Sequence, residues 1–316
     1  MKKIVWIMNT KDQTGLYNSS AVIWWYGILE NLGYEVVYYA YEQYNIEELY
    51  ELIKDYRPDF TIIAAYNRIH TELIRIREFT KVYVLQSDDK WRYDNFSKFW
   101  IPFIDGVITY AGELNKYVSD GLKKEQFNLM RWGFNPVTMA KTDFKLNTQF
   151  GVSHTGGLHS DRINIINEFR SKGINVEVNQ NPNYDVTKAV WNNSKYSLCL
   201  TSNSTNTVKD TKGRIVEIPN WCVLLTQSFP EAELYYDTIN ELVMFDSVDE
   251  AIEKMKYLDA HPDEYEKIKI AGKRKLWNSN TAYHEWNKIL PNIDPDYKQL
   301  DITKILKENH REYYYI

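Results

Sequence analysis

The chain has 316 residues, and its 38 Lys and Arg against 43 Asp and Glu give a net charge of −5. A hydrophobic share of 44% with 26% charged residues is typical of a folded globular protein and excludes a disordered chain. The mild acidity argues against a protein that coats nucleic acid or an anionic membrane through bulk charge, although a local basic groove is compatible with it.

The length predicts two domains, because single hydrophobic cores stop growing at about 250–300 residues. The basic and then apolar start of the chain resembles a signal peptide, but its apolar run stops at Asn9. No apolar run approaches the ~20 residues of a membrane span. Cys199 and Cys222 lie in strand-like runs, which predicts buried free thiols in a reducing compartment. We therefore expect a cytoplasmic protein.

Short apolar runs alternate with helix-period segments through the first half of the chain. The expected strands are 3–8, 34–39, 60–65, 82–86, 106–110 and 127–131. The expected helices are 19–32, 46–56, 72–79, 95–104 and 113–121. Strands that alternate with helices of ~10–15 residues predict βαβ units on a parallel sheet.

The alternation stops at a turn around Asn135-Pro136 and resumes near residue 150, so we expect a linker at 136–149 between domains 1–135 and 150–290. The expected strands of the second domain are 150–155, 175–178, 196–201, 222–226 and 242–245. Its expected helices are 161–171, 186–192, 214–219, 248–258 and one long helix from 262 towards 290. The tail 291–316 is expected to pack back on the first domain. Two such halves predict an α/β fold of twin Rossmann-like domains, with parallel sheets facing across a ligand cleft.

The first polar constellation follows the fourth expected strand, where doubly wound sheets place ligand-contacting loops. Asp88, Asp89, Trp91 and Arg92 there are suited to holding a sugar by hydrogen bonds and ring stacking, and one carboxylate is suited to act as a general base. The structural alternative is a capped helix in which Arg92 pairs with a neighbouring acid and Trp91 belongs to the core.

The second constellation opens the second domain, where a strand runs into Gly156-Gly157 and then into a helix that carries Arg162. Glycines permit close backbone approach, and a helix N-terminus with a permanently charged arginine favours an anion such as a diphosphate. Turn chemistry alone explains the glycines equally well. His154 and His159 are candidates for contacting phosphate or sugar, with a structural histidine as the simpler interpretation. No Cys, His or Asp cluster has ligand spacing, so we predict no metal site.

The third constellation is Lys212-Gly-Arg214-Ile-Val-Glu217, which follows a polar loop and precedes an apolar strand. Arg214 and Glu217 are three residues apart and share a helix face, which predicts at least a surface ion pair. The functional alternative is that the basic groups meet phosphate while Glu217 accepts hydrogen bonds from ribose hydroxyls. Pro219 ends the short helix and makes the segment a rigid shelf.

These segments resemble those of a known family. Residues 87–98 and 103–109 are similar to the first domain of spore-maturation-protein-B-like glycosyltransferases. Further stretches resemble the second-domain signature and the C-terminal part of that family: Lys212–Pro219, Leu224–Thr226 with Glu231 and Tyr235, Ser247–Glu250 and Tyr283–Trp286. The resemblance covers most of the chain from Gln86 to Leu290. It implies a GT-B glycosyltransferase of the group 1 type.

The resemblance also implies roles for individual residues. Glu217 matches the acid that holds the donor ribose, and Lys212 and Arg214 lie beside the phosphates. Gly156, Gly157 and Arg162 fall where such enzymes grip the diphosphate, and Gly15 approaches the donor from the first domain. The chain departs from the family at Lys209, which stands where the common motif has a second acid, and at Trp221-Cys222, which replaces a small glycine-containing pair.

The expected function is therefore metal-independent transfer of a sugar, of hexosyltransferase type, from a nucleoside-diphosphate sugar to an acceptor hydroxyl. A UDP-sugar is the favoured donor, no cofactor is bound permanently, and the acceptor is a glycan, protein or small molecule. If transfer inverts the anomeric centre, Asp88 or Asp89 is the expected base. Three alternatives stay open: a non-catalytic nucleotide-sugar-binding protein, a nucleotide-sugar epimerase of the same fold, and a transferase that acts on a modified base in DNA, as in some phages. The last is compatible with the basic run 267–275, which is also explained as a solvated helix face.

Overall fold

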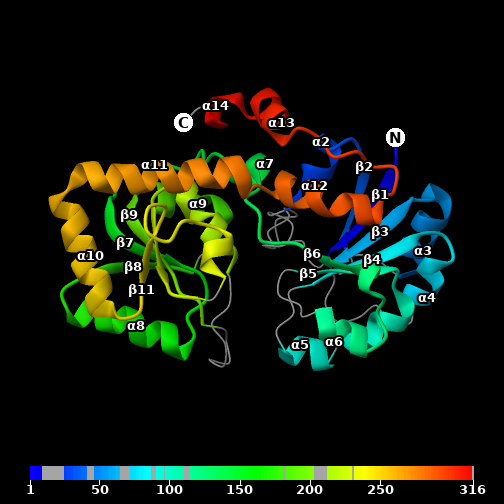
Figure 1. Ribbon diagram of the computed structural model, residues 1–316, viewed down its shortest axis with the longest axis horizontal. Coiled ribbons are helices and arrows are strands. Elements are labelled where there is room, and N and C mark those ends of the chain that lie inside the picture. Colours follow the sequence, from blue (N-terminus) through cyan, green and yellow to red (C-terminus); the bar gives the residue numbers. More distant parts are fainter. Residues whose placement is uncertain are drawn as a thin grey trace. The chain divides into compact units, whose positions relative to one another are not determined.

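The computed structural model describes residues 1–8, 25–40, 46–64, 72–86, 90–95, 97–109, 114–180, 183–202, 212–229 and 231–314. The chain divides into two compact units (Figure 1). Unit 1 comprises Met1–Arg131 and Ala282–Ile305, and unit 2 comprises Trp132–Thr281 and Leu306–Ile316. Within the described ranges, no helix is both long and apolar enough to span a bilayer.

Unit 1 is built on a parallel sheet in the order β2-β1-β3-β4-β5-β6. Its strands are β1 Lys3–Met8, β2 Glu35–Ala40, β3 Phe60–Ala64, β4 Lys81–Gln86, β5 Gly106–Thr109 and β6 Phe127–Leu129. Its helical segments are α2 Ile28–Asn31, α3 Ile46–Tyr56, α4 Glu72–Arg77, α5 Lys90–Asn95, η2 Ser97–Phe103, α6 Leu114–Ser119, η3 Lys124–Gln126 and α12 Ala282–Ile293.

Different helices cover the two faces of the unit 1 sheet. Side chains alternate along a strand, so neighbouring residues of β1 pack against different helices. In β1, Val5 and Ile7 join the core cluster that also takes residues from α3, α4 and α6. Trp6 lies on the opposite face, where its ring is 5.6 Å from that of Trp286 in α12. Trp25 packs on the same Trp286 ring at 6.0 Å. Helix α12 therefore completes the core of unit 1, although the sequence analysis placed residues 282–290 in the second domain.

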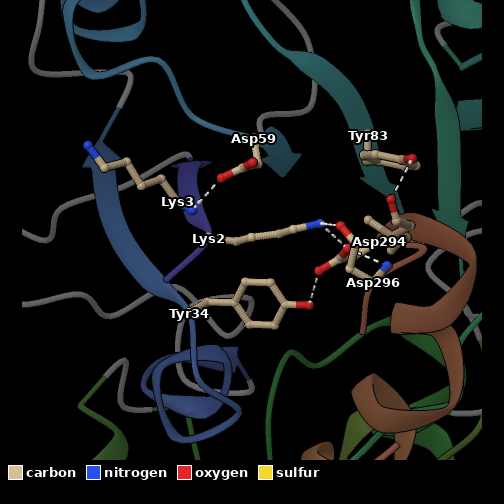
Figure 2. A network of polar contacts seen from close by, with 8 residues as sticks. Lys2, Lys3, Tyr34, Asp59, Tyr83, Asp294 and Asp296 are labelled. Carbon is tan, nitrogen blue, oxygen red and sulfur yellow. Dashed lines mark hydrogen bonds and ion pairs between the residues drawn. The ribbon is translucent and has the colours of Figure 1, made fainter. Parts of the chain in front are cut away.

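A polar network ties the segment after α12 to the amino-terminal ends of the unit 1 strands (Figure 2). Lys2 donates to Asp294 and, at 2.9 Å, to Asp296. Tyr34 donates its hydroxyl to the second carboxylate oxygen of Asp294 at 2.9 Å. Tyr83 in β4 donates to the backbone carbonyl of Ile293 at 3.3 Å. The return segment is thus held by ionic and neutral hydrogen bonds in addition to apolar packing.

Unit 2 is built on a second parallel sheet, in the order β11-β10-β9-β7-β8. Its strands are β7 Phe150–Thr155, β8 Val176–Asn179, β9 Ser194–Cys199, β10 Val223–Gln227 and β11 Val243–Phe245. Helices α8 Ser160–Ser171 and α10 Val248–Ala260 cover one face, and α9 Tyr184–Asn192 and α11 Pro262–Ser279 cover the other (Figure 1). The remaining segments of unit 2 are α7 Pro136–Met139, η4 Gly213–Val216, η5 Ile218–Asn220, η6 Ala232–Leu234 and α14 Arg311–Tyr314. Helix α13 Ile302–Asn309 begins in unit 1 and ends in unit 2.

The expected single helix from 262 towards 290 is wrong, because the chain breaks at Asn280 and Thr281 between α11 and α12. The backbone carbonyl of Asn280 accepts a hydrogen bond from the Phe134 amide at 2.8 Å, and Thr281 forms a parallel bridge with Phe134. The Asn280 side chain donates to the carbonyl of Tyr235 at 2.7 Å. The bond from Phe134 therefore occupies the Asn280 carbonyl, which a continuous helix needs for its own hydrogen bonds.

The expected helix 95–104 is also replaced. The chain forms α5 Lys90–Asn95 and then the tighter η2 Ser97–Phe103, which contains Pro102. A proline removes a helical donor and clashes with the preceding turn, which disfavours a continuous α-helix. Trp100 and Ile101 in η2 are buried in the same cluster as the strands of unit 1.

Candidate functional site

The strand order of unit 2 reverses at β7, which lies between β8 and β9. In a doubly wound sheet, the crevice outside the carboxyl ends of the strands at such a reversal is the usual ligand position. The chain leaves β7 through Gly156, whose φ of 125° lies in a region that favours glycine. Helix α8 begins at Ser160, four residues further on. We call this place, with the chain that leaves β9 after Cys199, the β7–β9 edge.

Arg162 joins the two loops of the β7–β9 edge. Its Nη1 donates to the carbonyl of Gly157 at 2.9 Å, and its Nη2 donates to the carbonyl of Ser202 at 2.9 Å. The guanidinium therefore fixes the loop after β7 against the loop after β9. It also leaves a permanent positive charge at the edge of the sheet.

Several buried polar side-chain atoms at this edge have no hydrogen-bond partner among the described residues. They are Nε2 of His154 and the hydroxyl oxygens of Thr155, Thr201 and Ser202, none of which meets a partner within the part of the chain that the structure describes. All four residues are at most 8% exposed. Buried polar atoms in native proteins nearly always have partners, so a cluster of such atoms at one sheet edge indicates a place for a polar ligand.

The imidazole of His154 is held in one orientation by the neighbouring strand. Its Nδ1 lies 3.3 Å from the carbonyl of Leu198, which makes Nδ1 the donor and leaves Nε2 as an acceptor in the neutral ring. Burial, together with the charges of Arg162 and Arg214, lowers the pKa of His154 to about 4. The ring is therefore neutral at neutral pH and lies close to two arginines.

Cys199, at the end of β9, lies close to the same cations. Burial raises the pKa of its thiol to about 11, while the charges of Arg162, Arg214 and Lys212 lower it. Both cysteines are free and buried, as the sequence predicts, and Cys222 is 1% exposed. The β7–β9 edge thus combines a positive potential with unpartnered polar atoms, which suits an anion that also carries hydroxyl groups.

Arg214 lies on the short helix η4, and Glu217 is the residue between η4 and η5. Both contact side chains of α9. Glu217 is 0% exposed and forms an ion pair with Nη1 of Arg214. Its other carboxylate oxygen accepts a hydrogen bond from the hydroxyl of Tyr184 at 2.5 Å. The Arg214 guanidinium carbon lies 5.7 Å from the centre of the Tyr184 ring and 5.3 Å from that of the Trp191 ring.

Other parts of unit 2 hold the η4–η5 segment by hydrogen bonds, and Pro219, which was expected to end the short helix, lies inside η5 instead. Tyr236 donates to the carbonyl of Ile215 at 3.0 Å. Trp277 in α11 donates to the side chain of Asn220 at 3.0 Å. A Cβ added to Gly272 in α11 would lie 2.4 Å from the carbonyl oxygen of Glu241, which shows how closely this part of α11 is packed.

The structure brings one group of the predicted site residues together. Gly156, Gly157, Arg162, Lys212, Arg214 and Glu217 all belong to the β7–β9 edge or to the shelf beside it. The predicted residues Gly15, Asp88 and Asp89, and the departure noted at Lys209, lie outside the described residues. Trp91 and Arg92 belong to α5, and only their backbone is described.

Sequence reasoning missed Tyr184 and Trp191, which surround Arg214. They are seven residues apart in α9, which is two helical turns, so their side chains share a face. The centres of the two rings are 5.9 Å apart. That spacing of two aromatic residues was the available signal. It did not stand out because such pairs usually belong to a core.

Two lysines of the basic run in α11 form ion pairs within the helix, as on a solvated helix face. Lys267 pairs with Glu264 at 2.7 Å and Lys269 with Glu266 at 3.9 Å, each with an acid three residues earlier. Among the described residues, no group of three or more His, Cys, Asp or Glu is placed to hold a metal ion.

Residues 148–291 match the family model described as glycosyl transferase-like. No curated protein matches the chain in sequence. Among solved structures, the chain is similar to an alpha-glucosyltransferase in complex with UDP-glucose and DNA containing an abasic site, with a TM-score of 0.68 and 11% identity over 92% of this chain and 99% of that one. It is also similar to Anabaena Alr3699/HepE in complex with UDP-glucose, with a TM-score of 0.55 and 10% identity over 98% of both chains.

A third similar structure is UDP-GlcNAc 2-epimerase from Neisseria meningitidis bound to UDP-GlcNAc, with a TM-score of 0.55 and 10% identity over 93% of this chain and 100% of that one. These likenesses confirm the predicted fold class, the GT-B arrangement of two Rossmann-like domains with parallel sheets. The residues that match the family model, 148–291, include the β7–β9 edge.

Proposed function

We propose that the protein is a metal-independent glycosyltransferase that binds a nucleoside-diphosphate sugar at the β7–β9 edge and transfers the sugar to an acceptor hydroxyl. The carrying observation is the set of unpartnered buried polar atoms of His154, Thr155, Thr201 and Ser202 beside cationic side chains. Phosphate oxygens and sugar hydroxyls together supply both the acceptors and the donors that this set lacks. The family match and the UDP-sugar complexes among the similar structures support the same ligand class.

In this proposal, Arg214 and Lys212 stabilise the charge that develops on the leaving diphosphate, and Gly156 and Gly157 allow its close approach. Arg162 contributes charge while it holds the two loops together. Asp88 or Asp89 remains the proposed base for an inverting transfer. Gly15, Trp91, Arg92 and the relationship to the spore-maturation-protein-B-like group remain predictions from the resemblance.

A thermal-shift screen over ADP, GDP, UDP and dTDP and their sugars tests the donor site. A ligand that binds only the folded state at 100 times its Kd adds about 2.7 kcal/mol of stability. We expect the largest shift with UDP or a UDP-sugar, and a loss of that shift in Arg214→Ala. Lys267→Ala, on the exposed face of α11, is the matched control that keeps the shift. A flat screen with the folded wild type contradicts the proposal.

A turnover assay separates transfer from binding alone. Release of UDP from the UDP-sugar selected by the screen is measured with candidate acceptors, with and without EDTA. Metal-independent transfer predicts equal rates in both conditions. Binding without turnover under every condition would identify a non-catalytic nucleotide-sugar-binding protein instead.

Two of the similar structures favour specific second candidates. The 2-epimerase likeness favours a reaction on the donor alone, which product analysis without any acceptor detects as a changed sugar. The glucosyltransferase–DNA complex favours a base in DNA as the acceptor. Transfer of labelled sugar to duplex DNA that contains hydroxymethylated cytosine tests this acceptor, and unmodified DNA of the same sequence is the control.

A further inference from the structure

The carboxylate of Glu217 is fully enclosed by its own unit. One oxygen accepts the Tyr184 hydroxyl at 2.5 Å, and the other is paired with Nη1 of Arg214. The residue has no exposed surface at all. A ribose hydroxyl therefore reaches this carboxylate only if Tyr184 or Arg214 moves away, and each such movement breaks a hydrogen bond that involves a buried charge.

The same contacts hold Arg214 in one place. Its guanidinium lies over the Tyr184 and Trp191 rings, at 5.7 and 5.3 Å from their centres, and Glu217 pairs with one corner of its fork. A guanidinium has five N–H donors in a rigid plane, so a bond through Nη1 leaves donors for a second anion. The charge of Arg214 also reaches the β7–β9 edge, because it lowers the pKa of His154 and of Cys199.

We propose that Glu217 and Tyr184 are positioning residues that fix the guanidinium of Arg214 for the donor diphosphate, and that Glu217 acts through Arg214 rather than by accepting hydrogen bonds from the ribose. This inference rests on the proposed donor site, and it replaces the ribose-binding role that the resemblance implies for Glu217. It predicts that removing the Glu217 charge weakens the binding of phosphate groups and leaves nucleoside binding unchanged.

Calorimetric titration with three probes separates the two roles: UDP, uridine and inorganic pyrophosphate. Glu217→Gln keeps the shape of the side chain and removes its charge. We expect this variant to lower the affinities for UDP and pyrophosphate by about ten- to hundredfold, the range for a lost charge-assisted hydrogen bond. The affinity for uridine should stay unchanged. Tyr184→Phe keeps the ring on Arg214 and removes only the hydroxyl, so we expect a smaller loss with the same selectivity.

A double-mutant cycle tests whether Glu217 acts through Arg214. In an Arg214→Lys background, adding Glu217→Gln is expected to cost no further UDP affinity, because a lysine lacks the planar fork that Glu217 orients. The matched control is Glu285→Gln in unit 1, where Glu285 is 1% exposed and pairs with Arg131 at 2.9 Å. It removes the carboxylate of a comparable buried pair and is expected to leave UDP affinity unchanged.

Different results overturn different statements. If Glu217→Gln lowers the affinity for uridine by the same factor as the affinity for UDP, Glu217 holds the ribose and the positioning role is wrong. If the two substitutions at 214 and 217 act additively on UDP, Glu217 does not act through Arg214. If the wild type binds none of the three probes, the proposed donor site itself is wrong. If Glu217→Gln does not fold, Tyr184→Phe still decides, since equal losses for UDP and uridine contradict the proposal.

Discussion

His154 belongs to β7 of unit 2, and its imidazole is buried. Burial and nearby arginine charges lower its pKa to about 4. An unfolded histidine titrates near 6.5, so between pH 6.5 and 4 the unfolded chain binds a proton that the folded chain does not. The stability of the fold therefore falls as the pH is lowered through this window. Burial lowers the pKa of His284 and His310 to about 4 as well, so they add to the same effect.

His154→Asn is expected to reduce the acid sensitivity, because the asparagine amide replaces the Nδ1 donor towards Leu198 and does not titrate. The slope of unfolding free energy against pH between 6 and 4.5 should decrease by up to about 1.4 kcal/mol per pH unit, the amount for one proton. Urea unfolding at several pH values measures the slope. An unchanged slope in the variant would show that His154 is not neutral in the fold.

Gly151 lies in β7 and Gly156 follows directly after it, so the two glycines form a matched pair. Gly156 has a φ of 125°, which is strained for any residue with a Cβ, whereas Gly151 has no positive φ and has space around its Cα. We expect Gly156→Ala to cost about 1–3 kcal/mol and to weaken UDP binding, since the loop must shift. Gly151→Ala should be neutral or stabilising by up to about 1 kcal/mol. Equal unfolding free energies for the two variants would contradict this.

At the scale of elements, apolar periodicity predicts the regular segments well. The bounds of β1 Lys3–Met8, α3 Ile46–Tyr56 and β7 Phe150–Thr155 agree with the sequence-based expectation because each run ends at a polar residue, a proline or a glycine. The break between α11 and α12 does not follow from periodicity, since it depends on pairing with Phe134, which is almost 150 residues away in the chain. The same limit applies to the site. The motif predicts that Arg214 and Glu217 belong to it, but only the packing shows that side chains of α9 contact them.

The packing of α11 against unit 2 leads to a prediction for that element. A Cβ at position 272 would lie 2.4 Å from the backbone carbonyl oxygen of Glu241, and a backbone group cannot turn aside as a flexible side chain does. We expect Gly272→Ala to destabilise unit 2 by about 1–3 kcal/mol despite the better helix propensity of alanine. Ile270→Ala, at a position that is 42% exposed in the same helix, is the control and should change stability by less than about 0.5 kcal/mol. Chemical denaturation followed by circular dichroism measures both, and an unchanged midpoint for Gly272→Ala would contradict the close packing.

At the scale of the whole molecule, unit 1 is discontinuous in sequence, because its core needs residues 282–305 as well as the first 131. The Lys2, Tyr34 and Asp294 network closes this unit at the amino-terminal ends of its strands, away from the carboxyl ends where ligand loops lie (Figure 2). We therefore expect its loss to affect stability without any direct effect on the donor site.

Lys2→Met tests this closure. The variant leaves the carboxylate of Asp294, which is 4% exposed, without its cation. We expect a loss of about 1–3 kcal/mol, less than for a fully buried pair because the Lys2 side chain is 33% exposed. Hydrogen exchange should accelerate in β1 and β2, while the UDP affinity stays unchanged. Lys54→Met removes the exposed pair with Glu51 and, as the control, should leave the free energy of unfolding nearly unchanged.

The pH dependence gives this prediction a second readout. Burial raises the pKa of Asp294, but the bonds from Lys2 and Tyr34 outweigh burial and hold the pKa below its usual value. A lowered acid pKa stabilises the fold above the unfolded value of about 3.9, and this contribution is lost as the pH falls through the folded value. The stability difference between wild type and Lys2→Met should therefore shrink below about pH 4, because Asp294 becomes protonated in both proteins. A difference that stays constant down to pH 2.5 would mean that Lys2 stabilises unit 1 through its aliphatic packing and not through its charge.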